Sequence, residues 1–206
     1  ELLILLQTLR LDSVGRITAV VPYFPYARSD KKDQPRVPIT ARLMADLIEV
    51  AGADRYMTID LHAGQIQGFF SIPGDVLTAF HIITDYMRDR VKELDDPVVV
   101  TTDLGFAKGG RNFAERIDVP LALIEKRRSK TGEHTEALNI VGEVVGKDVI
   151  IVDDEVDTAG SVEQAVNLVL EIGAKSVSLV FVHAVLSDPA VDRLFNLHLL
   201  DIVTTD

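Results

Sequence analysis

The sequence predicts an α/β fold in which parallel sheets are flanked by helices. Uninterrupted runs of β-branched residues, such as 149–152, suit strands that are covered on both faces. These runs alternate with helical patterns along the chain, an order that is typical of parallel sheets. Acidic residues end several of the expected strands. The elements form two sets, so we expect an incomplete first domain over residues 1–75 and a second domain over residues 76–206.

Composition and charge exclude several classes of protein. The 206 residues are 47% hydrophobic, which suits a globular chain with a buried core. A net charge of −11 disfavours non-specific binding to nucleic acid. There is no cysteine, so the chain has no disulfide, thiol nucleophile or zinc–thiolate site, and a cytoplasmic location is compatible with this. The apolar opening, residues 1–9, is too short to span a membrane.

The elements of the first domain are marked by apolar periodicity and by turn residues. The basic segment 27–36 has no apolar periodicity, and we therefore expect a loop there. Thr40 stands where a helix N-cap is expected, and Gly52 stands at the end of the same helix. In chain order, the expected elements are a helix over 1–10, a strand over 17–24, a loop over 27–36, a helix over 40–51, a strand over 56–60 and a loop over 61–75.

The second domain repeats the alternation with longer strands. Gly109 and Gly110 weaken one of its helices by roughly 1 kcal/mol each relative to alanine. The charged segment 126–136 is expected to be a loop. In chain order, the expected elements are a helix over 76–94, a strand over 97–103, a helix over 107–117, a strand over 120–125, the loop, a strand over 149–152, a helix over 162–172, a strand over 177–186, a helix from Pro189 and a strand near 201–205.

A turn of small residues, Asp157–Ser161, joins the strand over 149–152 to the following helix. Unpaired N–H groups at a helix start, together with the helix dipole, form a ready anion site. Ala159 and Gly160 let a phosphate approach the backbone closely, and the Thr158 hydroxyl can add a hydrogen bond. We therefore expect a phosphate to bind at this turn.

Two adjacent acids, Asp153 and Asp154, precede the turn. Paired carboxylates repel a phosphate, but they accept hydrogen bonds from the vicinal hydroxyls of a sugar or share a cation. A ligand with hydroxyls at one end and a phosphate at the other suits the whole stretch, so we predict a sugar-phosphate site. The simpler alternative is a capping turn with two solvated acids.

A nucleotide triphosphate, if one binds, must be held by something other than a glycine-rich phosphate-binding loop. The chain has neither a G-x-x-x-x-G-K-[ST] loop nor a G-x-G-x-x-G motif. Arginine and lysine side chains can hold phosphate oxygens instead, and Arg28, Lys31 and Lys32 offer them within one segment that also contains Ser29 and Asp30. A solvated charged loop is the alternative interpretation.

A metal site is predicted after the strand over 56–60. Asp60 and His62 are placed at i and i+2, on one side of the expected strand end, and Asp75 follows in the next loop. A magnesium ion usually keeps several waters and binds one or two protein groups together with substrate phosphates. His62 is therefore a candidate for the metal and for ATP.

A third basic element, Lys126-Arg127-Arg128, follows the expected strand over 120–125. Cations at this position could stabilise the charge that develops on a transferring phosphoryl group. Charge balance for the acidic loops is the alternative.

Together these pieces resemble the ribose-phosphate pyrophosphokinase family. The matching stretches are PYFPYARSDKKD, TIDLHAGQIQGFFSIPGD, TTDLG, LIEKRR and VDDEVDTAGS, in the order and spacing of the family. The resemblance covers essentially the whole chain, and the stretch DLHAGQIQGFF separates this family from ordinary phosphoribosyltransferases.

The resemblance implies two type I phosphoribosyltransferase-like domains, the first incomplete, with ATP on the side of the first domain and ribose 5-phosphate on the side of the second. It implies a magnesium-dependent reaction in which the anomeric hydroxyl of ribose 5-phosphate attacks the β-phosphorus of ATP. The products would be 5-phosphoribosyl diphosphate and AMP. It also implies assembly into homo-oligomers, dimers or hexamers.

The roles implied for individual residues follow the motifs. Lys126 would be the catalytic lysine of a mobile loop, and Arg128 would assist at the phosphates. The remaining roles that the resemblance implies are ATP at Arg28 and Ser29; magnesium at His62 and Asp103; ribose hydroxyls at Asp153 and Asp154; and the 5-phosphate at Asp157, Thr158, Ala159, Gly160 and Ser161. The residue patterns described above add Asp30, Lys31, Lys32 and His62 as candidates for ATP, and Asp60 and Asp75 as candidates for magnesium.

Three positions depart from the family pattern, namely Ser29, Ser71 and Gly109. Two other functions stay open. A catalytically silent regulatory homologue, or an inactive fragment, would bind nucleotide or sugar phosphate without turnover. A nucleobase phosphoribosyltransferase would need no ATP, and it leaves the segments 26–33 and 60–75 unexplained.

Overall fold

The chain forms two compact units, Glu1–Thr78 and Ala79–Asp206, in a computed structural model that describes residues 1–128 and 136–205. Each unit has its own sheet and its own hydrophobic core. The division expected after residue 75 falls inside strand β3 (Gly74–Leu77), so the units divide slightly later than the sequence predicts. No helix in the described part of the chain has the length and apolar character that a membrane crossing requires.

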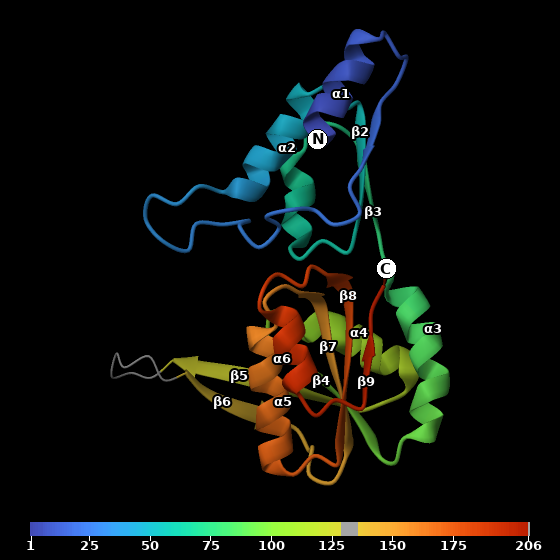
Figure 1. Cartoon of the computed structure of the whole chain (residues 1–206), viewed down its shortest axis with the longest axis vertical. Helices are drawn as coiled ribbons and strands as arrows, with labels where there is room; N and C mark the ends of the chain where they lie inside the picture. Colours follow the sequence, from blue (N-terminus) through green and yellow to red (C-terminus); the bar gives the residue numbers. More distant parts are fainter. Residues whose placement is uncertain (129–135, 206) are drawn as a thin grey trace. The chain divides into compact units, whose positions relative to one another are not determined.

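The first unit is built on a three-stranded parallel sheet in the order β1-β2-β3, drawn in blue and green in Figure 1. Helix α2 packs against α1 and against the short 3-10 helix η1. The elements are α1 (Leu2–Leu11), β1 (Thr18–Val20), α2 (Thr40–Val50), β2 (Arg55–Ile59), η1 (Gly64–Phe69) and β3 (Gly74–Leu77).

Helix α2 forms where the sequence predicts it, but its N-cap is a different residue. Thr40 is the first helical residue, and Ile39 occupies the N-cap position without a side-chain cap. Ala41 and Ile48 are fully buried in the core of the unit, as the apolar periodicity requires. Gly52 follows the helix at φ +113°, a left-handed conformation that glycine adopts without strain.

The second unit contains a six-stranded sheet in the order β6-β5-β4-β7-β8-β9. All neighbouring pairs are parallel except β5 and β6, which are antiparallel. The elements are α3 (Phe80–Arg90), η2 (Val91–Glu93), β4 (Pro97–Thr101), α4 (Ala107–Ile117), β5 (Leu121–Arg128), β6 (Glu136–Val141), β7 (Asp148–Val156), α5 (Gly160–Ile172), β8 (Ser176–Ala184), α6 (Ala190–Asn196) and β9 (Asp201–Val203).

The predicted fold class is confirmed, but several predicted boundaries are wrong, including the following three. Of the loop expected over 126–136, residues 126–128 belong to β5 and residue 136 to β6, and residues 129–135 lie outside the described part of the chain. The helix expected over 76–94 begins at Phe80, because the residues before it complete β3. Strand β7 continues to Val156, so the paired acids lie within the strand.

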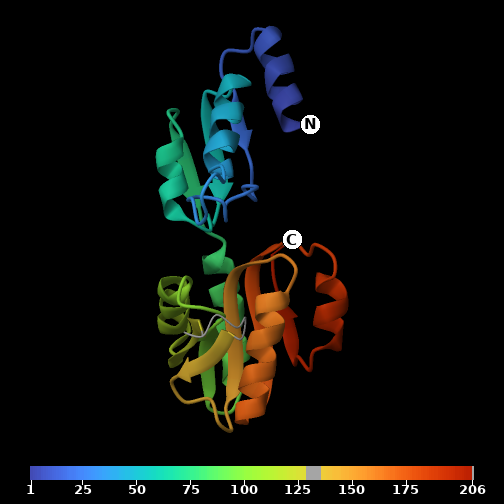
Figure 2. The ribbon, with the colours of Figure 1, turned by 90° about the vertical axis from the view of Figure 1, so that its left-hand side faces the viewer.

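Strand order in the second unit reverses between β4 and β7. From β4 the chain proceeds outward to β5, whereas from β7 it proceeds in the other direction to β8 and then β9. Because crossovers are right-handed, helices α4 and α5 cover opposite faces of the sheet, as Figure 2 shows. In open α/β sheets of this kind, ligands bind at the carboxyl ends of the strands at the reversal point.

Helix α5 closes the core on one face of this sheet. Its apolar positions 162, 165, 166 and 169 recur at helical spacing and are all buried. They pack against Val149 and Ile151 of β7, neither of which is more than 1% exposed. The start of α5 is thereby fixed at the carboxyl end of β7.

Candidate functional site

The turn before α5 is accessible and holds an uncommon backbone conformation. Ala159 is the N-cap of α5 at φ +60°, a left-handed conformation that costs an L-residue about 1–2 kcal/mol. Its side chain is buried, whereas Thr158 is exposed and Ser161 is half-buried. N–H groups in the first turn of a helix have no acceptor within that helix. Strained, accessible turns with such donors are typical of ligand sites.

Asp153 and Asp154 lie beside this turn at the reversal point of the sheet. The Thr102 hydroxyl, just after β4, donates to Asp153 Oδ2 at 2.6 Å and so joins β4 to β7. Burial raises the pKa of Asp153 to about 8, and the neighbouring charge of Asp154 acts in the same direction. The pair therefore retains a proton at neutral pH, and it can both donate to and accept from sugar hydroxyls.

Asp103 follows β4 and lies at the same end of the sheet, because Thr101 is in register with Val152 of β7. Its Oδ1 accepts hydrogen bonds from the N–H groups of Gly105 at 2.8 Å and Phe106 at 3.3 Å. One carboxylate oxygen thus shapes the turn that leads into α4. These contacts occupy Oδ1, and the role expected for Asp103 at magnesium stays a prediction.

Arg193 of α6 is a component of the turn that the sequence did not indicate. Its Nη1 donates to the carbonyl oxygen of Thr158 at 2.8 Å, and its Nε lies 3.3 Å from Oε2 of Glu163. A Cβ atom placed on Gly160 would lie 3.3 Å from the same Nη1. The guanidinium therefore lies against the turn and the first turn of α5.

The predicted catalytic residues Lys126 and Arg128 are part of β5, where their backbone pairs with Leu138 and Glu136 of β6. This corrects the expectation that they lie in a loop. Antiparallel pairing continues β5 beyond its parallel contact with β4, which ends at Leu123. The sequence signal for a strand was weak here, because charged residues end the apolar run of β5.

In the first unit, the basic segment 27–36 is anchored near its start. The Ser29 carbonyl accepts the N–H of Ala41 at 3.2 Å, and the Thr40 N–H donates to Ser29 Oγ at 3.4 Å. Asp30 is 8% exposed, and its carboxylate accepts a hydrogen bond from the side chain of Gln65 in η1. Ser29 and Asp30 thus hold the segment against α2 and η1.

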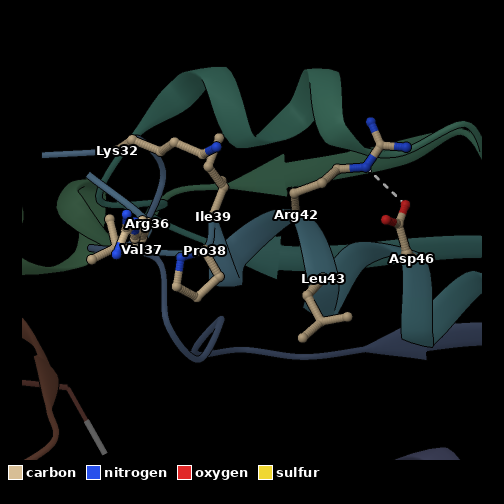
Figure 3. Close-up of a pocket in the computed structure, with 8 residues that line it drawn as sticks. All are labelled: Lys32, Arg36, Val37, Pro38, Ile39, Arg42, Leu43 and Asp46. Carbon is tan, nitrogen blue, oxygen red and sulfur yellow. Dashed lines mark hydrogen bonds and ion pairs between the residues drawn. The ribbon is translucent and has the colours of Figure 1, made fainter. Parts of the chain in front are cut away.

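The cations of the segment lie on both sides of these anchors in the chain. Arg28, Lys31 and Lys32 are exposed, and Lys32 lines a pocket of about 520 Å³ at the start of α2. In Figure 3, the Arg42 side chain extends toward Asp46, with an N···O distance of 2.8 Å. The pocket is lined by Lys32, Arg36, Val37, Pro38, Ile39, Arg42, Leu43 and Asp46.

The metal candidates of the first unit are not arranged as the sequence suggested. Strand β2 ends at Ile59, and Asp60 has φ +40°, so the alternation of a strand does not relate Asp60 to His62. Asp75 is held by a bidentate contact with Arg55 at 2.6–2.9 Å, which places it in the sheet rather than at a ligand. Among the described residues, no three His, Cys, Asp or Glu side chains are grouped to hold a metal ion.

Each of the two units matches a known domain family. The N-terminal domain of ribose phosphate pyrophosphokinase matches residues 1–52, and the phosphoribosyl transferase domain matches residues 76–201. The second match alone covers more than half of the chain. The resemblance seen in the motifs is thereby confirmed.

Individual relatives agree with this assignment. The ribose-phosphate pyrophosphokinase of Clostridium acetobutylicum is 50% identical over 203 residues, which are 98% of this chain and 63% of that protein. The corresponding protein of Campylobacter jejuni is 47% identical and aligns with 100% of this chain and 66% of its own length.

A solved structure extends the agreement to the fold. The crystal structure of phosphoribosylpyrophosphate synthetase from Mycobacterium smegmatis matches with a TM-score of 0.91 and 43% identity, over 99% of this chain and 66% of that one. The chain thus spans 63–66% of the length of the three relatives named here. It spans 61% of the length of the ribose-phosphate pyrophosphokinase of Clostridium perfringens. On these matches and on its motifs, the chain belongs to the ribose-phosphate pyrophosphokinase family.

Proposed function

We propose that the chain carries the substrate sites of a ribose-phosphate diphosphokinase, which transfers the pyrophosphoryl group of ATP to the anomeric hydroxyl of ribose 5-phosphate. The observation that carries the proposal is the placement of an acid pair and of the accessible turn before α5 at one end of β7, beside the reversal point of the sheet. A sugar with a terminal phosphate is the ligand class that this combination recognises.

In this proposal the second unit binds ribose 5-phosphate. Asp153 and Asp154 hydrogen-bond the vicinal hydroxyls, with the retained proton providing a donor. The 5-phosphate accepts hydrogen bonds from the backbone N–H groups and hydroxyls of the turn Asp157–Ser161, at the positive end of the dipole of α5. Separation of the acids from the phosphate along β7 and the turn avoids direct repulsion.

The first unit binds ATP through its basic segment. Arg28, Lys31 and Lys32 supply cations for the phosphates, as exposed side chains on an anchored backbone. Asp30 and Ser29 act in this proposal by holding the segment, because the carboxylate of Asp30 is buried against Gln65 and the Ser29 carbonyl and hydroxyl are bonded to the start of α2.

The transfer requires positioning and charge stabilisation rather than a protein nucleophile. The anomeric oxygen of the sugar forms a bond to the β-phosphorus and loses its proton. The bond from that phosphorus to the oxygen bridging the α-phosphate breaks, and AMP leaves with that oxygen. Lys126 and Arg128 are proposed to stabilise the negative charge that shifts toward the leaving AMP.

Magnesium is part of the proposal, as an ion held mainly by substrate phosphates. Such an ion takes only one or two protein groups. Asp60 and His62 of the first unit and Asp103 of the second are the candidates, and Asp75 is left out because Arg55 holds it. When bound, the ion would neutralise phosphate charge.

We further propose that the protein works as a homo-oligomer in the cytoplasm and binds neither nucleic acid nor membrane. The net charge of −11 supports the exclusion of non-specific binding to nucleic acid.

The direct test is product analysis with the full-length protein. ATP, magnesium and ribose 5-phosphate should give AMP and 5-phosphoribosyl diphosphate in equal amounts, measured by anion-exchange chromatography. Binding of ribose 5-phosphate without AMP formation would favour a silent homologue. Turnover that needs a nucleobase and no ATP would favour a phosphoribosyltransferase.

A further inference from the structure

One arginine outside the predicted site is bound to the turn that is proposed to hold the 5-phosphate. Arg193 lies on α6, which packs against α5, and it is 35 residues from Thr158 in the chain. Ala190 and Leu194 of α6 are buried, so the helix that carries Arg193 is fixed in the core. The guanidinium reaches outward from this fixed base to the turn.

The contact determines how one peptide group of the turn is oriented. Arg193 Nη1 binds the Thr158 carbonyl oxygen at 2.8 Å. In a trans peptide the C=O and the following N–H point in opposite directions. Binding the carbonyl therefore turns the N–H of Ala159 away from the arginine, where it can be offered to an anion. The left-handed φ of +60° at Ala159 depends on the same peptide group.

Glu163 holds the other part of the guanidinium, with Oε2 at 3.3 Å from Nε. An arginine that bridges a backbone carbonyl and a carboxylate uses its fork geometry, which a lysine cannot reproduce. Its charge is also largely balanced by Glu163. Both points favour a role in orienting the turn over a role as a free cation for the phosphate.

We propose that Arg193 is the positioning residue of the 5-phosphate turn, and that it sets the affinity for the phosphate of ribose 5-phosphate through the Thr158 peptide. This inference rests on the proposed function. It assigns to α6 a part in ligand binding, although α6 lies outside every motif of the sequence.

The test compares ribose 5-phosphate with ribose in NMR titrations of the 206-residue chain. Arg193→Ala should weaken ribose 5-phosphate binding at least tenfold and leave the weaker binding of ribose unchanged within twofold. Arg193→Gln, which keeps the aliphatic stem, should give the same pattern if the alanine variant is unstable. The affinity of Arg193→Lys for ribose 5-phosphate should lie closer to that of Arg193→Ala than to that of the unsubstituted chain, when the affinities are compared as logarithms.

Arg88→Ala is the matched control, because Arg88 is an exposed arginine of the same unit that pairs locally with Asp85. It should leave both affinities unchanged. Wild-type affinity in Arg193→Ala, full recovery by Arg193→Lys, or equal losses for ribose and ribose 5-phosphate would each overturn the positioning role. If the unsubstituted chain binds neither ligand, the proposed function fails first, and the role of Arg193 fails with it.

Discussion

The turn Asp157–Ser161 and the basic segment 27–36 are proposed to bind the two substrates, and they are built in different ways. The turn lies between a strand paired on both sides and a helix whose apolar face is buried, and Arg193 fixes one of its peptides. The basic segment is anchored near its start by Ser29 and Asp30, and its residues 31–36 are exposed.

Because of this difference, we expect the turn to be preorganised for its ligand and the basic segment not to be. Donors held by a packed core lose little entropy when a ligand binds, whereas long exposed cations must be ordered by the ligand. We therefore expect the sugar phosphate to bind to the turn without ATP, and ATP affinity to depend more on salt. Changes in the second unit should affect sugar binding and chemistry, and changes in the first unit should affect ATP.

The largest effect is expected at Lys126, which tests whether the chemistry lies in the second unit. Lys126→Ala in the full-length protein should lower kcat by about 10²–10⁴-fold, because charge on the transferring group loses its stabilising cation. AMP formation under saturating substrates measures this. Lys92→Ala is the control, since Lys92 is exposed and pairs only locally with Asp89 in the described contacts. Activity within threefold of the parent would remove Lys126 from the chemistry.

A smaller effect is expected at Asp154, which is 7% exposed. Asp154→Asn should weaken binding of ribose 5-phosphate about 10–100-fold, because hydrogen bonds from sugar hydroxyls to a charged acceptor are lost, and it should leave ATP affinity unchanged. Calorimetric titration with each ligand separates the two. Asp192→Asn, at an exposed acid of α6, is the control. An equal loss for ATP would show that the two sites are not independent.

The pH dependence of stability provides a test of the acid pair. Asp153 keeps its proton up to about pH 8 in the folded chain, whereas the unfolded carboxyl loses it near pH 4. The folded state therefore binds more protons between these values, and stability falls as pH rises from about 4 to about 8. Asp153→Asn should remove this slope and raise the free energy of unfolding at pH 7.5 by a few kcal/mol, since each pH unit between the two pKa values costs about 1.4 kcal/mol. Urea denaturation at pH 5.5 and 7.5 measures both quantities.

Asp148 serves as a control, because its pKa is shifted in the opposite direction from that of Asp153. Burial acts to raise its pKa, but hydrogen bonds from Ser176 and the Asp95 N–H, with the charge of Lys175, lower it overall. Its contribution to stability is present above the unfolded pKa and is lost as pH falls through the lower folded pKa. Asp148→Asn should therefore destabilise the chain at pH 7.5. A stabilising effect there, or an unchanged slope in Asp153→Asn, would contradict the assignment of these pKa shifts.

The smallest effect is expected in the first unit. Gln65→Ala removes the hydrogen bond to Asp30 and should raise KM for ATP about 2–10-fold, because the basic segment loses an anchor, while KM for ribose 5-phosphate stays unchanged. Gln67→Ala is matched to it, since the Gln67 side chain bonds only the nearby Gly64 carbonyl in the described contacts, at 3.1 Å. Steady-state kinetics that show equal effects for the two variants would contradict the anchoring role.

Local patterns in the sequence were sufficient for much of the fold. The spacing of 162, 165, 166 and 169 predicted α5, and the β-branched run at 149–152 predicted the buried part of β7. The patterns failed where pairing across the sheet decides the structure. The end of β5 carries charged residues and so left no apolar signal, whereas β6 is a short segment with four apolar residues that the predictions did not assign to a strand.

In the candidate site, too, some groups could be predicted from the sequence and others could not. The sequence by itself determined the acid pair and the small-residue turn, because these groups are neighbours along the chain and the start of a helix exposes N–H donors whatever surrounds it. Only the tertiary structure brought Thr102 to Asp153 and Arg193 to Thr158, across 51 and 35 residues. It also assigned Asp75 to Arg55 and Asp30 to Gln65. Such contacts depend on strand order and helix packing, which place distant residues side by side and are not encoded in the spacing of any one segment.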